Sequence, residues 1–340
     1  MVQIRENLSL RPYNSFGIDV RARSLAAFTS VEELNELLLS PGLGTNNKKL
    51  ILGGGSNILL TRDFDGLVLK NEIAGITVVK EDDEYIYVKA GAGENWHWFV
   101  LYCLEHNFAG VENLALIPGN IGASPMQNIG AYGVEIKDVF HDLEAIHLED
   151  GNLHLFSLND CAFGYRDSIF KRQYRDKFVI TSVTYRLRRD PQFNTSYGAI
   201  QQELDKMKVK DLSIKAIAQA VINIRSSKLP DPKEIGNAGS FFKNPQVEHN
   251  KFEALKRKYD TMPSFPVNKD HIKIPAGWLI EQCGWKGYRK GDAGCYPKQA
   301  LVLVNYGNAT GKEIWDLSEE IVRSVKDKFD ILLEREVNIV

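Results

Sequence analysis

Apolar residues recur at helical spacing in several parts of the chain. In residues 31–40 they lie three or four positions apart, which places them on one face of a helix. Ser30 and Glu33 at the start of this segment match a capping box, the paired side-chain and backbone bonds that begin many helices. The same spacing predicts further helices at 95–106, 213–225, 251–259 and 276–283, and one at 311–329 with a capping box at Thr310 and Glu313.

Other segments are short apolar runs bounded by turn residues, as β-strands are. Residues 76–79 and 85–88 are predicted to form one hairpin, and 143–148 with 153–156 another, across the turn residues Asp150 and Gly151. Single strands are expected at 50–52, 66–70, 178–187, 300–304 and 331–340, and a loop at 226–245. Interspersed strands and helices of this kind predict an α+β fold.

Length and charge restrict the class of protein. A chain of 340 residues is long enough for two domains. Its 42 Lys and Arg residues are balanced by 44 Asp and Glu residues, so the basic excess typical of nucleic-acid binding is missing. No apolar stretch reaches the ~20 residues that cross a bilayer, and the N-terminal residues lack the apolar segment of a signal peptide. We therefore expect no nucleic-acid partner and no membrane insertion.

Cysteine and histidine usage points to a cytoplasmic protein without a metal. The four cysteines are scattered and form no Cys-x-x-Cys pair, as is usual for reduced thiols in a cytoplasmic protein. The seven histidines show no spacing typical of metal ligands, so no metal site is expected.

Two glycine-rich segments are candidate binding loops. The first, Gly53-Gly54-Gly55-Ser56-Asn57, follows a predicted strand, and its glycines would let backbone N–H groups approach an anion. It matches neither the dinucleotide fingerprint nor the P-loop, and taken alone a tight turn is the simpler interpretation. The second, 117–133, is long and rich in small residues, as functional loops often are. Together they could hold a dinucleotide; the alternative for the second is a loop packed on itself.

Three further residues could carry chemistry. Arg166 lies among aromatic residues and could bind a carboxylate, although an ion pair with Asp167 is the common alternative. Ser240 follows a flexible Gly-Asn-Ala-Gly run without a neighbouring histidine base, which favours a proton donor over a nucleophile, the alternative being a helix cap. In an extended strand Glu334 and Glu336 share one face, where acids are usually solvated but can also point into a site.

Taken in order, these motifs resemble the UDP-N-acetylenolpyruvoylglucosamine reductases, type I branch, from about Leu10 to Val337. The motifs are GGGSN, IPG-IGASP-QNIGAYG, FGYRDSIFK, RSSKLPDP, GNAGSFFKNP, AGWLIEQCG, QALVLVN and LEREV. The resemblance implies an FAD-binding domain of the vanillyl-alcohol-oxidase or PCMH type at 10–190, with subdomains at about 10–71 and 72–190. A connecting segment, 191–212, would carry Tyr197. A UDP-sugar-binding domain at 213–340 would return Glu336 to the active site on its last strand.

The resemblance also implies binding residues, and two positions depart from the family pattern. Asn120 stands where a smaller residue or cysteine is expected, and Phe265 stands where some members have tyrosine, so one hydroxyl contact to the substrate is expected to be absent. Non-covalent FAD would be held by Gly53, Gly54, Gly55, Ser56, Asn57, Pro118, Gly119, Ser124, Asn128, Ile129, Gly130, Ile180 and Arg225. The UDP-sugar would be held by Tyr165, Tyr197, Lys228, Asn244, Lys273 and Gln299.

The implied reaction is a reduction in peptidoglycan synthesis. NADPH would reduce FAD, and a hydride would then pass to the enolpyruvyl group of the UDP-sugar, giving UDP-N-acetylmuramate. Arg166 would hold the carboxylate, Glu336 would hydrogen-bond it, and Ser240 would supply the proton. A monomer is expected on the same grounds. Two alternatives stay open: another flavin oxidase of this fold, and a nucleotide-sugar sensor without catalysis.

Overall fold

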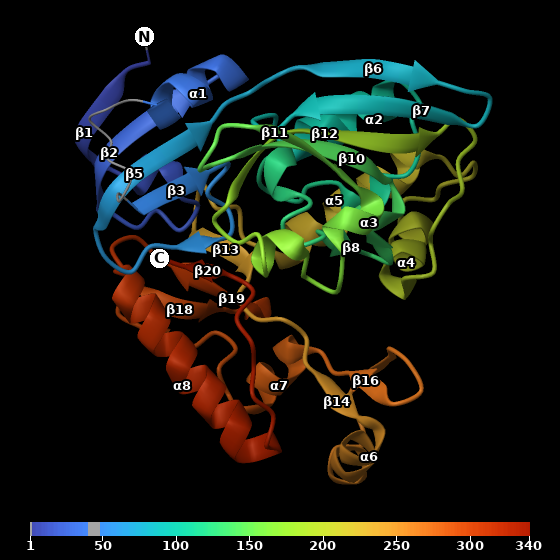
Figure 1. Ribbon diagram of the computed structural model, residues 1–340. Helices are drawn as coiled ribbons and strands as arrows, with labels where there is room; N and C mark the ends of the chain where they lie inside the picture. Colours follow the sequence, from blue (N-terminus) through green and yellow to red (C-terminus); the bar gives the residue numbers. More distant parts are fainter. Residues whose placement is uncertain (1, 40–47) are drawn as a thin grey trace. The chain divides into compact units, whose positions relative to one another are not determined.

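The structure, a computed structural model, describes residues 2–39 and 48–340 (Figure 1). The chain forms two units that each combine distant segments of sequence. Unit 1 comprises Met1–Leu8, Ala22–Gly55 and Asp65–Ser227, and unit 2 comprises Ser9–Arg21, Ser56–Phe64 and Lys228–Val340.

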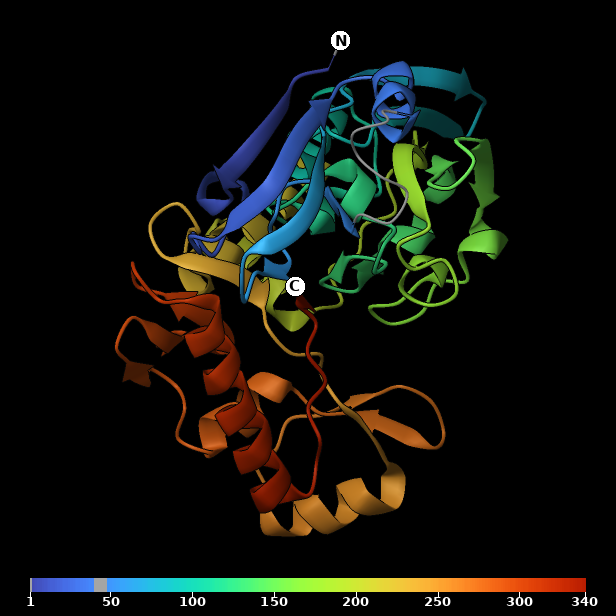
Figure 2. The same ribbon diagram turned by 60° about the vertical axis from the view of Figure 1, so that its left-hand side comes forward.

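The N-terminal part of unit 1 is a four-stranded sheet with one helix. Its strand order is β1 (Ile4–Ser9), β2 (Arg21–Phe28), β5 (Phe64–Asn71), β3 (Lys48–Leu52), and Figure 2 shows the blue strands side by side. Strands β3 and β5 are parallel. Helix α1 (Val31–Leu39) turns Leu34 and Leu37 into a core shared with Phe28 of β2. This core anchors β3, the strand that leads into the first glycine segment.

The larger part of unit 1 is an antiparallel sheet with helices packed against it. The strand order is β11 (Leu153–Ser157), β10 (Phe140–His147), β12 (Phe178–Arg188), β7 (Tyr85–Gly91), β6 (Ile76–Glu81). Helices α2 (Trp96–Glu105) and α5 (Ile214–Lys228) share its core (Figure 1). Shorter elements complete the unit: α3 (Leu158–Cys161), α4 (Gly198–Lys206), β8 (Gly130–Ala131) and β9 (Val134–Glu135).

Unit 2 is built on a second antiparallel sheet, of order β13 (Gly236–Ser240), β19 (Gln299–Asn305), β18 (Ala293–Tyr296), β17 (Arg289–Lys290). Helices α7 (Ala276–Gln282) and α8 (Gly311–Phe329) contact β19 and each other. A smaller sheet orders β14 (Gln246–Glu248), β16 (His271–Lys273) and β15 (Phe265–Pro266), and α6 (His249–Lys258) contacts it. Finally, β20 (Asn338–Ile339) pairs in parallel with β4 (Ile58–Leu59).

Most predicted elements are confirmed, including both hairpins and the capping box of α8, in which the Thr310 hydroxyl accepts from the Glu313 N–H at 3.2 Å. The predicted capping box of α1 forms only in part. The Ser30 hydroxyl accepts from the Glu33 N–H at 3.2 Å, whereas the Glu33 carboxylate accepts from the backbone of Thr29 at 2.6 Å. Ser40, the last residue predicted for this helix, lies outside the described residues. The α+β fold class is confirmed.

Two predicted segments are wrong. Residues 226–245 were expected to be a loop, but α5 continues to Lys228 and 236–240 form β13, because their backbone pairs with β19 despite a composition that favours turns. Residues 331–340 were expected to be one strand. Burial of Ile331, Leu333 and Val337 does alternate, but the ladder consists only of a bridge at Arg335 and the short β20. Alternating apolar residues predict an extended backbone. A β-strand also needs a neighbouring strand to which that backbone can hydrogen-bond.

The division into units differs from the expected domains. The C-terminal domain was placed from residue 213, yet α5 belongs to unit 1. The apolar stripe of this helix, including Ile217 and Val221, is fully buried in the core of the larger sheet. Its packing therefore extends unit 1 beyond the polar stretch taken as the boundary.

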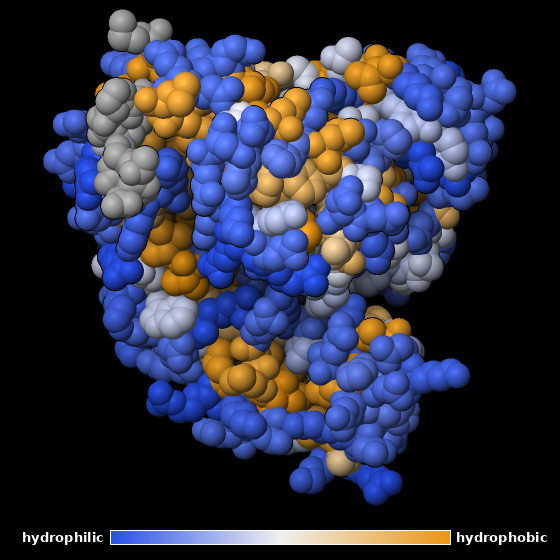
Figure 3. Space-filling model, in the orientation of Figure 1, coloured by the Kyte–Doolittle hydropathy of each residue, from blue (hydrophilic) through white to orange (hydrophobic). Residues whose placement is uncertain are grey.

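On the face seen in Figure 3, the surface is largely hydrophilic and carries several apolar patches. Across 2–39 and 48–340, none of the helices combines the length and apolar character that spanning a membrane requires.

Candidate active site

The two glycine-rich segments meet inside unit 1. A Cβ on Gly54 would lie 2.7 Å from Oδ1 of Asn120 and 3.0 Å from Cα of Gly119, distances that real Cβ atoms avoid. Gly119 has φ +113°, a conformation that glycine adopts without strain. We call this close approach of the backbones of residues 53–55 and 119–120, at which a Cβ would intrude, the glycine cradle. Such a cradle fits the pyrophosphate of a dinucleotide, which backbone N–H groups can approach closely.

The second glycine segment is hydrogen-bonded to the first residue of α2 and to the turn before this helix. The N–H of Trp96 donates to the carbonyl of Gly119 at 3.0 Å, and the Asn120 amide donates to the carbonyl of Gly93 at 2.6 Å. Asn120, at a position where a smaller residue was expected, thus ties the loop to the turn before α2 and fills the space beside Gly54. The larger side chain is accommodated because Gly54 has none.

Three of the residues predicted to line the flavin make hydrogen bonds that stabilise the second loop: Ser124, Asn128 and Ile129. The Ser124 hydroxyl is buried and lies 2.7 Å from the Tyr185 hydroxyl. The buried Asn128 amide donates to Glu135 Oε2 and to the carbonyl of Gly164, both at 3.0 Å. The N–H of Ile129 donates to the Ser124 carbonyl at 3.1 Å. The side chains of Ser124 and Asn128 therefore hold the loop in shape.

Arg166 sits at a strained turn that the loop supports. Gly164 and Asp167 pair across a two-residue turn, and Arg166 has φ +53°, a left-handed conformation unusual for a side chain of this size. Its Nη2 donates to the carbonyl of Gly130 at 2.8 Å. The Asp167 carboxylate, expected as a possible partner of Arg166, contacts the Nε of Arg172 at 3.2 Å. Strain of this kind persists where the surrounding bonds compensate it, as at functional sites.

A second arginine stands near the first. The Nε of Arg225 donates to the carbonyl of Leu116 at 3.2 Å, and its guanidinium also hydrogen-bonds the Tyr132 side chain. Burial lowers the pKa of Arg225, and the charge of Arg166 contributes to the lowering. Tyr132 packs edge-on against Tyr197, with ring centroids 5.3 Å apart. Arg225 and Tyr197, assigned to cofactor and substrate by resemblance, are thus linked through Tyr132.

Tyr132 itself was not singled out from the sequence. It lies one residue before the end of the second glycine segment, has φ +50°, and its carbonyl accepts from the buried Asn113 amide at 3.1 Å. The same amide donates to the carbonyl of Asn194 at 2.9 Å, in the segment before Tyr197. The one signal in the sequence was an aromatic residue inside an otherwise small-residue loop.

Ser240 is the last residue of β13 in unit 2, so it is not a helix cap. Gly239 before it has φ +68°, and the Gly239 N–H donates to the Asn237 side chain at 3.0 Å, where the pairing with β19 shifts register. The next residues, Phe241 and Phe242, are fully buried. Ser240 is therefore half-buried between a bulge and two anchored aromatic rings, a rigid support for one hydroxyl.

The C-terminal segment that carries Glu336 pairs with the residues after β13. The Glu336 N–H donates to the carbonyl of Phe241 at 2.9 Å, and Phe242 bridges Arg335. The Glu336 carbonyl accepts from the Asn57 amide at 3.4 Å, so the end of the first glycine segment adjoins the same place. The neighbouring acid Glu334 is exposed and pairs with Lys243. The two acids that share a face in an ideal strand therefore have different surroundings.

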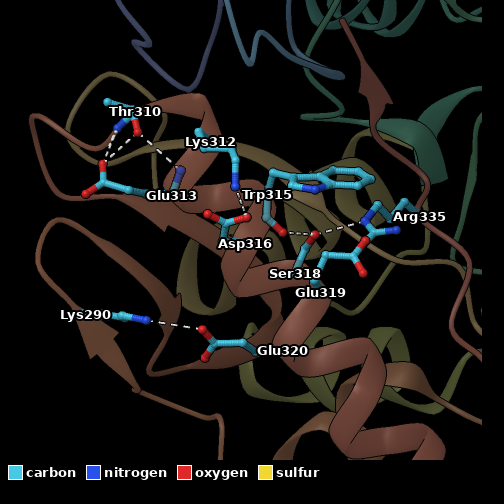
Figure 4. A network of polar contacts seen from close by, with 10 residues as sticks. All are labelled: Lys290, Thr310, Lys312, Glu313, Trp315, Asp316, Ser318, Glu319, Glu320 and Arg335. Carbon is cyan, nitrogen blue, oxygen red and sulfur yellow. Dashed lines mark hydrogen bonds and ion pairs between the residues drawn. The ribbon is translucent and has the colours of Figure 1, made fainter.

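Arg335 anchors this C-terminal segment to α8 (Figure 4). Its guanidinium carbon lies 4.0 Å from the ring centroid of Trp315, and its Nε donates to the Ser318 hydroxyl at 2.9 Å. It also pairs with Glu319. The ring contact, the hydrogen bond and the ion pair together fix Arg335 against α8. Because Glu336 is the next residue in the chain, they also restrict the position of its backbone.

Three of the residues predicted to bind the UDP-sugar gather around the start of α7. The Asn244 side chain accepts from the Ala276 N–H at 2.8 Å. A Cβ on Gly277 would lie 2.8 Å from Oε1 of Gln299, so the glutamine side chain lies against the helix. Lys273 pairs with Gln246 in the small sheet. This cluster lies wholly in unit 2.

The remaining predicted residues are spread over both units. Unit 1 holds Arg166 and the FAD residues other than Ser56 and Asn57, while unit 2 holds Ser56, Asn57, Ser240 and Glu336. Tyr165 packs beside Arg166, with its ring centroid 5.5 Å from the guanidinium carbon, and Lys228 is exposed at the end of α5. Pro118 is exposed, Ile180 is buried on β12, and Phe265 is 46% exposed. The described residues contain no metal-ligating cluster of His, Cys, Asp and Glu.

Known proteins share both parts of this architecture. Residues 25–157 match the family model of an FAD binding domain, and residues 231–340 match that of the UDP-N-acetylenolpyruvoylglucosamine reductase C-terminal domain. The UDP-N-acetylenolpyruvoylglucosamine reductases of Flavobacterium johnsoniae and Amoebophilus asiaticus are 51% and 49% identical to the chain, over 100% of both partners. The crystal structure of the Thermus caldophilus reductase superposes with TM-score 0.68 at 22% identity, over 100% of this chain and 98% of that one, which shows the shared fold.

Together, the glycine cradle and the matched FAD binding domain define an FAD-dependent oxidoreductase. The length and identity of the matches go further: the chain belongs to the UDP-N-acetylenolpyruvoylglucosamine reductase family.

Proposed function

We propose that the chain reduces UDP-N-acetyl-3-O-(1-carboxyvinyl)-glucosamine to UDP-N-acetylmuramate with NADPH, as a cytoplasmic monomer in peptidoglycan synthesis. The observation that carries the proposal is 51% identity over the whole length to a reductase of this name. The four free cysteines agree with a reducing compartment.

The glycine cradle is assigned to FAD. Backbone groups of Gly53, Gly54 and Gly119 would hold the pyrophosphate, and Ile129, Gly130, Ile180 and Arg225 would line the flavin, together with Ser56, Asn57, Pro118, Ser124 and Asn128. Once reduced by NADPH, bound FAD would supply the hydride that adds to the β-carbon of the enolpyruvyl double bond. No histidine lies in either glycine segment to attach the cofactor covalently, in keeping with non-covalent binding.

Arg166 is assigned to the substrate carboxylate. When hydride adds to the β-carbon, the electron pair of the double bond moves onto the α-carbon and its carboxylate. A fixed cation at the carboxylate stabilises this charge where it develops. The turn at Gly164–Asp167 and the bond to Gly130 restrict the guanidinium in advance, so little reorganisation is needed.

Ser240 and Glu336 are assigned to the proton and to the carboxylate. The Ser240 hydroxyl would donate its proton to the α-carbon, completing the D-lactyl ether, and Glu336 in its protonated form would hydrogen-bond the carboxylate. A serine hydroxyl is a weak acid, so its neighbours must stabilise the alkoxide that remains. The pairing of the C-terminal segment with Phe241 supports the assignment, because it joins the backbone of Glu336 to the residue that follows Ser240.

The residues around α7 are assigned to the nucleotide. Asn244, Lys273 and Gln299 offer amide and ammonium groups of the kind that bind diphosphate and uracil, with Lys228, Tyr165 and Tyr197 as further contacts. NADPH also carries a diphosphate, so one set of groups can serve both ligands in turn.

The test begins with the purified protein. Its absorption spectrum should show flavin bands that NADPH bleaches without oxygen and that the enolpyruvyl UDP-sugar restores, with UDP-N-acetylmuramate as product. Colour that stays with acid-precipitated protein would favour a covalent flavin oxidase. Flavin that NADPH reduces but the UDP-sugar never reoxidises would favour a sensor. A protein that cannot be loaded with FAD would contradict the proposal.

A further inference from the structure

Leu116 has an unusual backbone immediately before the FAD loop. Its φ is +58°, a left-handed conformation that leucine rarely adopts. Pro118 and Gly119, two and three residues later, belong to the proposed flavin site. Since the conformation of Leu116 sets the direction in which these residues leave the core, whatever fixes Leu116 also shapes the cradle.

Both backbone polar groups of Leu116 are held by side chains from helices. Its N–H donates to Nδ1 of His97 on α2 at 3.1 Å, and its carbonyl accepts from Nε of Arg225 on α5 at 3.2 Å. Bonds of this kind compensate the cost of a left-handed conformation in a residue other than glycine. His97 thereby connects α2 to the residue that Arg225 also binds.

The bond restricts the chemical state of His97. Nδ1 can accept from Leu116 only when it carries no proton, so the ring must be neutral with its hydrogen on Nε2. Burial lowers the pKa of His97, and the nearby Arg225 cation lowers it further. The environment therefore maintains the form of the imidazole that the bond needs.

We propose that His97 is a positioning residue for FAD binding: by accepting from Leu116 it holds the Leu116–Gly119 backbone in the conformation that receives the cofactor. It acts through Leu116 and is not assigned a contact with the flavin. This inference rests on the proposed flavin site.

The test compares replacements that differ in where they offer an acceptor. In His97→Asn, Oδ1 occupies nearly the place of Nδ1; in His97→Gln the amide reaches the place of Nε2 instead; His97→Leu has no acceptor. His106, the residue that caps the C-terminal end of α2, is the matched control, because its Nδ1 lies 2.8 Å from the carbonyl of Tyr102 and therefore bonds only its own helix. FAD affinity is measured by titrating each apoprotein and following flavin fluorescence, with circular dichroism to confirm folding.

We expect His97→Leu and His97→Gln to bind FAD about tenfold more weakly, the effect of leaving one buried donor unsatisfied. His97→Asn and His106→Leu should bind within about threefold of wild type on the same basis. Wild-type affinity in His97→Gln, or loss in His97→Asn equal to that in His97→Gln, would overturn the inference. If wild-type apoprotein itself bound no FAD, the proposed function would fail instead.

Discussion

The backbone N–H of Glu336 donates to the carbonyl of Phe241 at 2.9 Å. This bond joins the C-terminal segment to the residue after Ser240, so the two segments that carry the proposed acid and the proposed hydroxyl pair with each other although they are distant in the sequence. The roles proposed for Ser240 and Glu336 can be tested separately, because each residue can be replaced without changing this backbone bond.

The first prediction concerns the hydroxyl of Ser240. Ser240→Ala removes the proposed proton donor and leaves the glycine cradle untouched. Flavin reduction by NADPH should keep its wild-type rate, while reoxidation by the enolpyruvyl UDP-sugar should slow by roughly 10²–10⁴-fold, the usual worth of a positioned proton donor. Stopped-flow absorbance follows both half-reactions in one protein, so reduction serves as the control. Unchanged reoxidation would remove Ser240 from the mechanism.

The second prediction separates the two C-terminal acids. Glu336→Ala should slow reoxidation by about 10²-fold, since a hydrogen bond to the developing charge is lost. Glu336→Gln should slow reoxidation less, because its amide can still donate a hydrogen bond to the substrate carboxylate, as the protonated native acid would. Glu334→Ala is the matched control: Glu334 is exposed and paired with Lys243, and its loss should leave the rate unchanged. Equal losses at positions 334 and 336 would contradict the assignment.

Arg166 is tested by a substitution that keeps its charge. Arg166→Lys removes the forked donor geometry, so we expect a higher KM for the UDP-sugar and reoxidation about 10–100-fold slower. Arg172→Lys, close by and paired with Asp167, should behave as wild type. Steady-state kinetics with NADPH saturating, together with stopped-flow reoxidation, measure both effects. Kinetics within a few-fold of wild type for Arg166→Lys and Arg166→Ala would argue against a carboxylate contact.

Gly54 is tested through the cradle. In Gly54→Ala the new Cβ would lie 2.7 Å from the Asn120 side chain and 3.0 Å from Gly119, which must move apart. FAD affinity should fall by about tenfold or more, while the fold remains, because a shift of a few tenths of an ångström is cheaper than unfolding. Gly198→Ala is the control, since a Cβ there meets nothing within 4 Å. Fluorescence titration with FAD compares the two; equal affinities would contradict the cradle.

The last prediction concerns pH and the buried acid Glu112. Burial raises its pKa above 4.5, outweighing hydrogen bonds such as that from the Gly110 N–H at 2.7 Å. The folded state therefore holds the proton more tightly than the unfolded chain. This stabilisation is fully present below pH 4.5 and is lost as pH rises through the raised value.

Glu112→Gln stays neutral at every pH, so its free energy of unfolding should improve relative to wild type as pH rises from about 4 to 7. Urea unfolding at several pH values with FAD saturating measures the difference. The exposed Glu105→Gln should show no such trend. A difference that stays constant with pH would contradict a raised pKa at Glu112.

Local chemistry was readable from the sequence. Helical spacing predicted α2, α5 and α8, and Thr310 with Glu313 correctly marked the start of α8. The glycine segments, Arg166 and Ser240 were proposed because their residue types and flanking motifs suggest anion binding, carboxylate binding and proton donation, whereas Glu336 was chosen over Glu334 by the resemblance to the reductase family. Such signals lie within a few neighbouring residues, where spacing and side-chain chemistry suffice.

Pairing between distant segments was decided only by the tertiary structure. The contact of Gly54 with Gly119, the strand β13 within an expected loop, and the pairing of Glu336 with Phe241 all depend on backbone groups whose partners lie far along the chain. The roles of His97 and Tyr132 also emerged from contacts between elements. Sequence patterns report the burial and conformation that each residue favours, whereas a long-range hydrogen bond depends on the packing of the whole unit.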